Sequence, residues 1–589
     1  MKKKNYFLCA LATFMFASCS ESLPDGGDDG NGNSGAGGDA WVSLNVQTTT
    51  STKALHDPDQ ENGTADESKV NEMMALFFDS HLTGSNNPGL LTKLTWSTGD
   101  PEIGTPGQPD GTPTKAFKVD KNSKAFLIVL NPSAEFKASV ASASDFDAVN
   151  KVIANTGVSS VIGGATQNSF MMSNAKGKLE PTTIVDAGSS VTVTDNDLVT
   201  YATATEAEDK PYKVTVDRVA AKVRLFADAN YPQSTLDINT IGWTLNVTNK
   251  KYYPMSERTL TWLETSARGC ITPFDKWKFG SYRLDPNYDG QKTSMTDITT
   301  APYTDNYAYY THATAPTWVA ATADSTGSNA SKIPALYCLE NTQEEDDNYY
   351  AYTTHVLLKV ESQPKGLQLP DNGGVYNGTA NSDTDVDASG NVVSGADWIK
   401  IGTNGYYSYK LVVKYIEAEL TKKYTDKDPD NFLQTTVTNA FSAYLDSLVK
   451  YIVPNVTAIT LPTKVQFEAA SYPTVAAGAA TIAAQFLQNG VIAKGAAAYG
   501  SVSYFEGGEG YHVIMIKHDN DTDNTNNKHG EFGVVRNSVY DIAIKDIKSP
   551  GYPTIPDPDP EKKDEEEESY ISVEIGINPW TWYRQEEEL

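Results

Sequence analysis

The chain has 589 residues, which is enough for two or three domains, because a single hydrophobic core rarely grows this large. Hydrophobic residues make up 39% and aromatic residues 10% of it, with 32 tyrosines, so the chain has the material for real cores. The formal net charge of −28 argues against a partner that presents a phosphate backbone, and no nucleic acid is expected.

The first residues are typical of an export signal. Lys2–Lys4 precede an apolar run over 6–16, and small residues lead to Cys19. The run is too short for a stable membrane anchor. A cysteine directly after Ala-Ser resembles a bacterial lipobox, which predicts Cys19 as the lipidated, palmitate-bearing first residue; an ordinary signal peptide is the alternative. Of the later cysteines, Cys270 and Cys338 could form a disulfide in an exported protein or remain free thiols.

A Gly/Asp/Asn-rich linker over 21–39 leads into the first predicted strand. The apolar residues Val42, Leu44 and Val46 alternate with polar ones, as in a strand with one buried face. The stretch 53–68 is rich in Asp, Asn, Glu and Gly, which predicts an exposed loop.

Short apolar segments separated by turn signals fill the rest of the chain. The predicted strands are 70–79, 124–132, 213–227, 241–249, 335–342, 354–362, 406–416, 504–518 and 533–552. A short helix is expected at 144–155 with Ser144 as its cap, and helical spacing from Phe432 to Leu448 together with an Ala-rich stretch at 476–499 predicts a helical insertion. Many short strands with few helices favour an all-β architecture of sandwiches, with a domain boundary near 228–236.

The end of the chain contains a strand pattern without a local sheet. Residues 553–569 are acidic and rich in proline, which predicts an extended, solvated tether. Beyond it, four apolar residues alternate with polar ones: Ile571, Val573, Ile575 and Ile577. Such a strand needs a sheet either in its own second domain or in another molecule.

The sequence offers little that indicates catalysis or metal binding. It contains no zinc-protease, nucleophile-elbow or phosphate-loop motif, so no catalytic residue, no cofactor and no enzyme activity are predicted. His512 and His518 lie on one face of a predicted strand, but surface histidines are the better interpretation. The acidic loops 383–391 and 519–524 lack the Gly and Glu that a Ca²⁺ loop needs at its sixth and twelfth positions, so no metal site is predicted.

Several motifs together resemble a known family. They are the lipobox, "VDRVAAKV" (216–223), "YCLENT" (337–342), "GYHVIMIKH" (510–518), "GVVRNSVYDIAI" (533–544) and "NPWTW" (578–582). The chain resembles the Mfa-type fimbrillins, the major shaft subunits of type V pili in the FimA/Mfa fimbrillin superfamily. The resemblance implies a mainly β fold of two tandem, transthyretin-like β-sandwiches with a helical insertion in the second and an extended C-terminal strand.

The resemblance also implies a division of the chain. The expected segments are a signal peptide (1–19), a linker with a removable N-terminal strand (20–53), the first sandwich (54–230), the second sandwich (231–552) with its insertion at about 417–500, the tether (553–569) and the C-terminal donor strand (570–589).

In this family, a surface protease removes the N-terminal strand, and the C-terminal strand of another subunit fills the open groove. By analogy, Val42, Leu44 and Val46 would form the removable strand. The donor strand would contain Ile571, Val573, Ile575 and Ile577. The first arginine of the chain is Arg218, so an arginine-specific cut near residue 50 is impossible, and we expect a trypsin-like protease that accepts lysine to cut between Lys53 and Ala54.

The expected partners are other copies of the chain, accessory fimbrial subunits, the maturation protease, the outer membrane through the lipid of the precursor, and ligands on host or bacterial surfaces. The expected location is the outer membrane for the precursor and the surface fimbria for the mature form. Two alternatives remain open: a fimbrial anchor or tip subunit, and a glycan-binding surface lipoprotein that does not polymerise.

Overall fold

The structure is a computed structural model of the chain. It describes residues 38–48, 63–82, 86–106, 112–154, 157–175, 179, 182–186, 191–227, 236–255, 257–258, 283–288, 290–321, 334–344, 347–364, 394–401, 406–408, 421, 425, 464–486, 502–518, 531–564 and 572–579. Within these ranges the protein is mainly β, and no helix is long and apolar enough to cross a membrane.

The first domain is built on a six-stranded sheet. Its strands, in spatial order, are β2 (Leu44–Thr48), β10 (Tyr212–Arg218), β7 (Met172–Asn174), β6 (Ala125–Leu130), β3 (Glu72–Phe78) and β4 (Leu90–Ser97). The predicted strands at 70–79 and 124–132 are confirmed as β3 and β6. Both are continuous apolar runs, because they occupy the middle of the sheet and are buried along their length.

Smaller elements complete this domain. They are β1 (Asp39–Val42) paired with β5 (Phe117–Asp120), the hairpin of β8 (Thr182–Asp186) and β9 (Val191–Asp195), and the helices α1 (Ala134–Ala141), α2 (Phe146–Val149), α3 (Ser159–Ile162) and α4 (Ala204–Asp209). The helix expected at 144–155 is shorter than predicted. Its cap is Asp145 rather than Ser144, because the Asp145 carboxylate accepts the hydrogen bond from the Ala148 N–H.

The chain passes from the first domain to the second at Val219. The stretch 213–227 was predicted to be one strand but forms two, β10 and β11 (Ala220–Ala227), which belong to different sheets. The crossing therefore lies ahead of the boundary expected at residue 230. Alternation alone could not locate it, since both strands continue the same apolar pattern.

The second domain has two four-stranded sheets that share one core. The first contains β18 (Ala335–Leu339), β11, β24 (Ser538–Asp546) and β25 (Ser572–Pro579), and the second contains β17 (Val319–Ala320), β12 (Leu236–Asn246), β19 (His355–Pro364) and β23 (Glu509–Met515). Trp243 of β12 and Tyr540 of β24 are buried between them. This arrangement is a sandwich, in which each sheet buries one face against the other.

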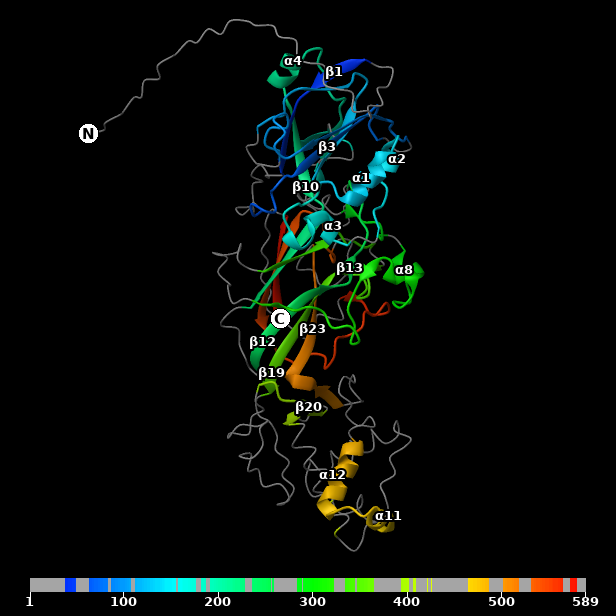
Figure 1. The fold of residues 1–589 in the computed structure, drawn as a ribbon, viewed down its shortest axis with the longest axis vertical. Coiled ribbons are helices and arrows are strands. Elements are labelled where there is room, and N and C mark those ends of the chain that lie inside the picture. The colour runs from blue at the N-terminus through cyan, green and yellow to red at the C-terminus, as the bar shows by residue number, and fades with distance from the viewer. Residues whose placement is uncertain are drawn as a thin grey trace, which may run out of the picture.

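A satellite core rich in tyrosine lies beside this sandwich and includes Tyr303, Tyr307 and Tyr352. The elements around it are β13 (Thr248–Asn249), β16 (Tyr307–Ala308), α7 (Gln291–Ser294) and α8 (Ala301–Thr304), with β14 (Glu257–Arg258) paired to β15 (Arg283–Leu284) nearby. Figure 1 shows the molecule as a long body, with the first domain at one end and α11 (Lys464–Ala469) and α12 (Val475–Phe486) at the other.

The helical insertion is described only in part. Helices α11 and α12 lie within it, and next to it is a small sheet of β20 (Trp398–Ile401), β21 (Tyr406–Ser408) and β22 (Val502–Phe505). The helix predicted between Phe432 and Leu448 lies outside the described residues. Cys270 does as well, whereas Cys338 is a free, buried thiol whose pKa burial raises to about 12.

Candidate functional site

The N-terminal strands fill part of the first core. Val42 ends β1, and Leu44 and Val46 lie on β2; their side chains are 2%, 0% and 2% exposed, and all three belong to the main cluster of the first domain. Alternation explains the placement of Leu44 and Val46 on β2, because every second side chain of a strand points to the same face, whereas Ser43 between the two strands is buried as well. The three side chains are therefore part of the first core.

This segment is held by two different ladders. Strand β1 pairs antiparallel with β5, and β2 pairs parallel with β10, in the register Leu44 to Tyr212 and Val46 to Val214. Strand β2 lies at the edge of its sheet, so only one neighbour would lose its partner if it left. Residues Cys19, Lys53 and Ala54 lie outside the described residues.

The C-terminal strand lies on the second domain of the same chain. Strand β25 pairs antiparallel with β24, and Val573, Ile575 and Ile577 stand opposite Ile544, Ile542 and Tyr540. These three partners are buried in the second core. The register therefore matches the apolar series of β25 to the core series of β24 at the open edge of that sheet. Ile571 lies outside the described residues.

The expected tether is not free along its length. Ile555 is buried, the backbone N–H of Tyr350 donates to the carbonyl of Lys562, and the Thr353 hydroxyl donates to the carboxylate of the fully buried Asp564. Residues 553–564 thus line the second domain, contrary to the prediction of a solvated linker. The composition misled because this segment packs through Ile555, Pro558 and Asp564, while its other acidic residues, Asp557, Asp559 and Glu561, are exposed.

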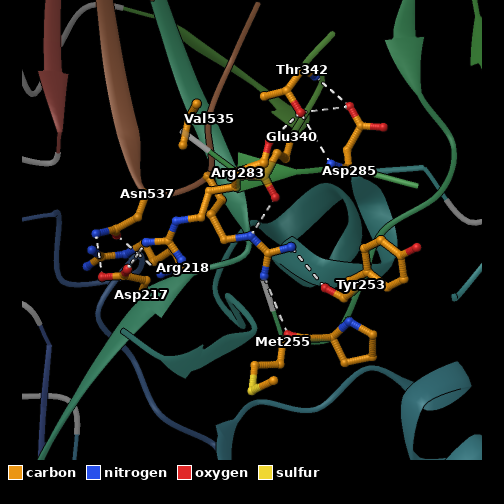
Figure 2. Close-up of polar contacts among 12 residues, drawn as sticks. Asp217, Arg218, Tyr253, Met255, Arg283, Asp285, Glu340, Thr342, Val535 and Asn537 are labelled. Atoms are coloured by element: carbon orange, nitrogen blue, oxygen red, sulfur yellow. Dashed lines mark hydrogen bonds and ion pairs between the residues drawn. The ribbon is translucent and has the colours of Figure 1, made fainter. Parts of the chain in front are cut away.

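A buried network of charges joins the two domains, and the sequence reasoning did not find it. Asp217, near the end of β10, forms an ion pair with Arg283 at 2.9 Å. It also accepts a hydrogen bond from Asn537, which directly precedes β24. Arg536 donates to the Glu340 carboxylate at 3.0 Å and to the backbone carbonyls of Tyr253 and Pro254. Figure 2 shows Asp217 and Asn537 on one side of this network and Tyr253 on the other.

The signal for the network was present in the sequence. "VDRVAAKV" and "GVVRNSVY" place charged residues inside or directly beside apolar strands, where a buried charge must be paired to be tolerated. A second anchor of the same kind joins Glu67 to Lys222 at 2.9 Å, with both side chains almost fully buried.

The histidines do not form a metal site in the described part of the chain, where no suitable group of ligands occurs. His512 is buried with both ring nitrogens unpartnered, which is contrary to the surface position expected for it, and burial lowers its pKa to about 4. His518 contacts the Tyr540 hydroxyl at 2.8 Å. Burial also lowers the pKa of His355 to about 4, although its bond to the Thr353 carbonyl opposes this.

Comparison with known families identifies the C-terminal part. Residues 503–586 match the family described as "Major fimbrial subunit protein type IV, Fimbrillin, C-terminal". This range contains β23, β24, β25 and all of β22 but Val502, so it includes the C-terminal strand and the strand on which it lies. The resemblance to the fimbrillins is confirmed by this match, which supports a role as a fimbrial subunit at the cell surface.

Solved structures give weaker similarities. A candidate cell adhesion protein from Parabacteroides distasonis has a TM-score of 0.36 at 11% identity, covering 94% of this chain and 99% of that one. A fimbrillin, FimA, from Porphyromonas gingivalis has a TM-score of 0.35 at 12% identity, covering 93% and 99%. The tip fimbrial protein Mfa3 from the same species has a TM-score of 0.28 at 15% identity, covering 56% and 84%. No curated protein matches the chain.

Proposed function

We propose that the protein is a structural subunit of a surface fimbria that polymerises by strand exchange and supports adhesion. The observation that carries this proposal is the state of β1 and β2: their apolar residues complete the first core, yet β2 lies at a sheet edge and is followed by a stretch with a candidate cut. Loss of the segment would leave a groove that only another apolar, alternating strand can fill.

The C-terminal strand has the pattern that this groove requires. Burial of the Val42, Leu44 and Val46 side chains stabilises the first domain by roughly 5–9 kcal/mol of transfer free energy, at about 1.5–3 kcal/mol each. Strand β25 carries an apolar series with the same period of two. A donor from a second subunit could therefore replace most of this burial, and main-chain hydrogen bonds to β10 would add to it. In this proposal β25 leaves β24 when it is used between subunits.

Maturation follows the order that the family resemblance implies. The precursor is exported, lipidated on Cys19 and held at the outer membrane. A protease that accepts lysine cuts between Lys53 and Ala54, and the segment ahead of the cut leaves the first domain. Adhesion to surfaces is then a property of the assembled fimbria.

The test is a charge placed in the donor strand. Val573→Asp would bury an unpaired carboxylate in the acceptor groove, which is costly, whereas Asn578→Asp on the polar series of the same strand is the matched control. We expect normal export and cleavage for both variants but filaments only from the control. Filaments from Val573→Asp subunits would refute the donor assignment.

One observation favours a second candidate function. Strand β25 completes the second domain of its own chain, which is the arrangement expected of a tip subunit or a glycan-binding lipoprotein that offers no free donor. In that case the wild-type protein would stay monomeric after the cut.

A further inference from the structure

Within the described residues 63–71, which follow the candidate cut, a buried carboxylate ties the chain to the second domain. The Glu67 carboxylate pairs with the Lys222 ammonium of β11 at 2.9 Å and accepts a hydrogen bond from the Tyr337 hydroxyl of β18. The side chains of Glu67 and Lys222 are 2% and 3% exposed. Burial raises the pKa of Glu67, but Lys222 and the hydrogen bonds outweigh burial and hold the pKa below its ordinary value. The carboxylate therefore stays ionised at neutral pH.

The backbone around Glu67 is ordered by the same contacts. The Thr64 N–H donates to the Glu67 carboxylate at 2.7 Å, and the Glu67 N–H donates to the Thr64 hydroxyl at 3.2 Å. These reciprocal bonds close a turn over 64–68, as a capping box does at the start of a helix. The turn therefore depends on the carboxylate that the second domain holds.

The same turn supports the wall of the groove. Arg218, the last residue of β10, donates through Nε to the Glu67 carbonyl and through Nη2 to the Ser68 hydroxyl, both at 3.1 Å. Strand β10 is the direct partner of β2. When β2 leaves, β10 keeps β7 on its other side and the Glu67 turn at its end.

A cut between Lys53 and Ala54 changes how the turn over 64–68 is held in place. In the intact chain, the segment between β2 and β3 is fixed at both ends. After the cut the chain has a free end at Ala54, and a free chain end stays in place only where its contacts outweigh the cost of ordering it. Within the described residues of this segment, which begin at 63, the first buried tie is Glu67.

We propose that Glu67 is a positioning residue that retains the new chain end at the domain junction and so keeps the β10 wall of the groove in place while β1 and β2 leave. The proposal rests on the proposed cut, but it needs neither a filament nor a second subunit. It gives the buried Glu67–Lys222 pair a role in the cleaved form, beyond its contribution to the intact fold.

The test is hydrogen exchange on the full chain before and after a single cut. A recognition sequence for a site-specific protease replaces part of 54–62, so the natural protease is not required. The measured amides are those of 64–71 and of β10. The variants are Glu67→Gln, which leaves the Lys222 ammonium buried without its partner, and Glu72→Gln as the control, since Glu72 forms a more exposed pair with Lys137.

The wild type and the control should keep their protection in both regions within tenfold after the cut. Glu67→Gln should lose it by roughly a hundredfold or more after the cut, because removing one partner of a buried pair is costly and the cut end has no second attachment. The loss should be much smaller before the cut, because the intact segment is still fixed at both ends. Loss of protection in the cut wild type, or retention in cut Glu67→Gln, overturns the proposal.

A milder variant covers the case in which Glu67→Gln does not fold. Tyr337→Phe removes only one hydrogen bond to the carboxylate, and a loss of roughly tenfold in the cut form is expected, with no change in the intact form. Equal protection of cut Tyr337→Phe and cut wild type would contradict the role. If Val573→Asp subunits still polymerise while these exchange results hold, the donor assignment fails and the role of Glu67 stands.

Discussion

Shortening one side chain of the N-terminal strand should speed its departure after the cut. Leu44 is 0% exposed and lies in the main cluster of the first domain, opposite Tyr212 of β10. Replacing a buried leucine by alanine costs about 2–5 kcal/mol, through lost transfer free energy and the cavity left behind. In a cleaved chain this loss falls on the binding of the released segment, since the segment is then a separate molecule.

The expected size of the effect follows directly. At about 1.4 kcal/mol per tenfold, Leu44→Ala should weaken retention of the cut segment by roughly 30- to 3,000-fold. The control is Asn45→Ala on the same strand, because Asn45 is only half-buried and belongs to the polar series. The assay separates the cleaved protein by size exclusion under native conditions and measures the remaining segment by mass spectrometry.

The outcome that refutes the reasoning is equal retention of the Leu44→Ala and Asn45→Ala segments. It would mean that the ladders to β5 and β10, and not the apolar side chains, hold the strand. The groove would then select donors by backbone pairing, and the apolar alternation of β25 would not be a criterion for a donor.

Three further predictions concern maturation and acid stability. Cys19→Ala should give an unlipidated precursor that assembles poorly, and normal surface filaments from it would contradict the lipobox interpretation. Lys53→Ala should slow maturation and polymerisation together, and N-terminal sequencing of sheared filaments would show whether the mature chain still begins near residue 20. His512→Leu should stabilise the second domain in acid. The unfolded chain takes up a proton below pH 6.5, whereas the buried ring with its pKa of about 4 does not, so this difference in proton uptake lowers stability by about 2 kcal/mol at pH 5 and by almost nothing at pH 7. Urea unfolding of both proteins at these two pH values measures the difference, and equal pH dependence would contradict it.

Much of the fold could be predicted because the sheets follow local patterns. Strands β3 and β6 were visible as short apolar runs, and the segment at Val42–Val46 as an alternating one, since each pattern reflects burial on two faces or on one. The parallel pairing of β2 with β10 was not predictable in this way, because it joins segments far apart in the sequence. The same holds for the change of sheet at Val219.

The domain junction could not be assembled from the sequence for a different reason. Its members come from distant segments, and nothing in the spacing of Glu67, Lys222 and Arg536 pairs them with one another. A charged residue inside an apolar strand predicts only that a partner exists. Only the three-dimensional arrangement shows which carboxylate is the partner. Lys222 pairs with Glu67, and Arg536 pairs with Glu340.

The attachment of residues 553–564 limits how a neighbouring subunit could receive the C-terminal strand. If Asp564 stays bound to Thr353 in the filament, only residues 565–571 separate a fixed point from β25. Seven residues span at most about 25 Å when fully extended. The acceptor groove of the next subunit must therefore begin within that distance of Asp564, close to the second domain of the donor. If the groove lies farther away, Asp564 and the rest of residues 553–564 must detach from the second domain. The buried Thr353 hydroxyl then loses Asp564 as its partner. Asp564→Asn weakens this attachment. If the groove lies within reach of the attached Asp564, the variant should form filaments at the wild-type rate; if Asp564 must detach, the variant should form them faster. The rate of filament formation from cleaved subunits distinguishes the two geometries.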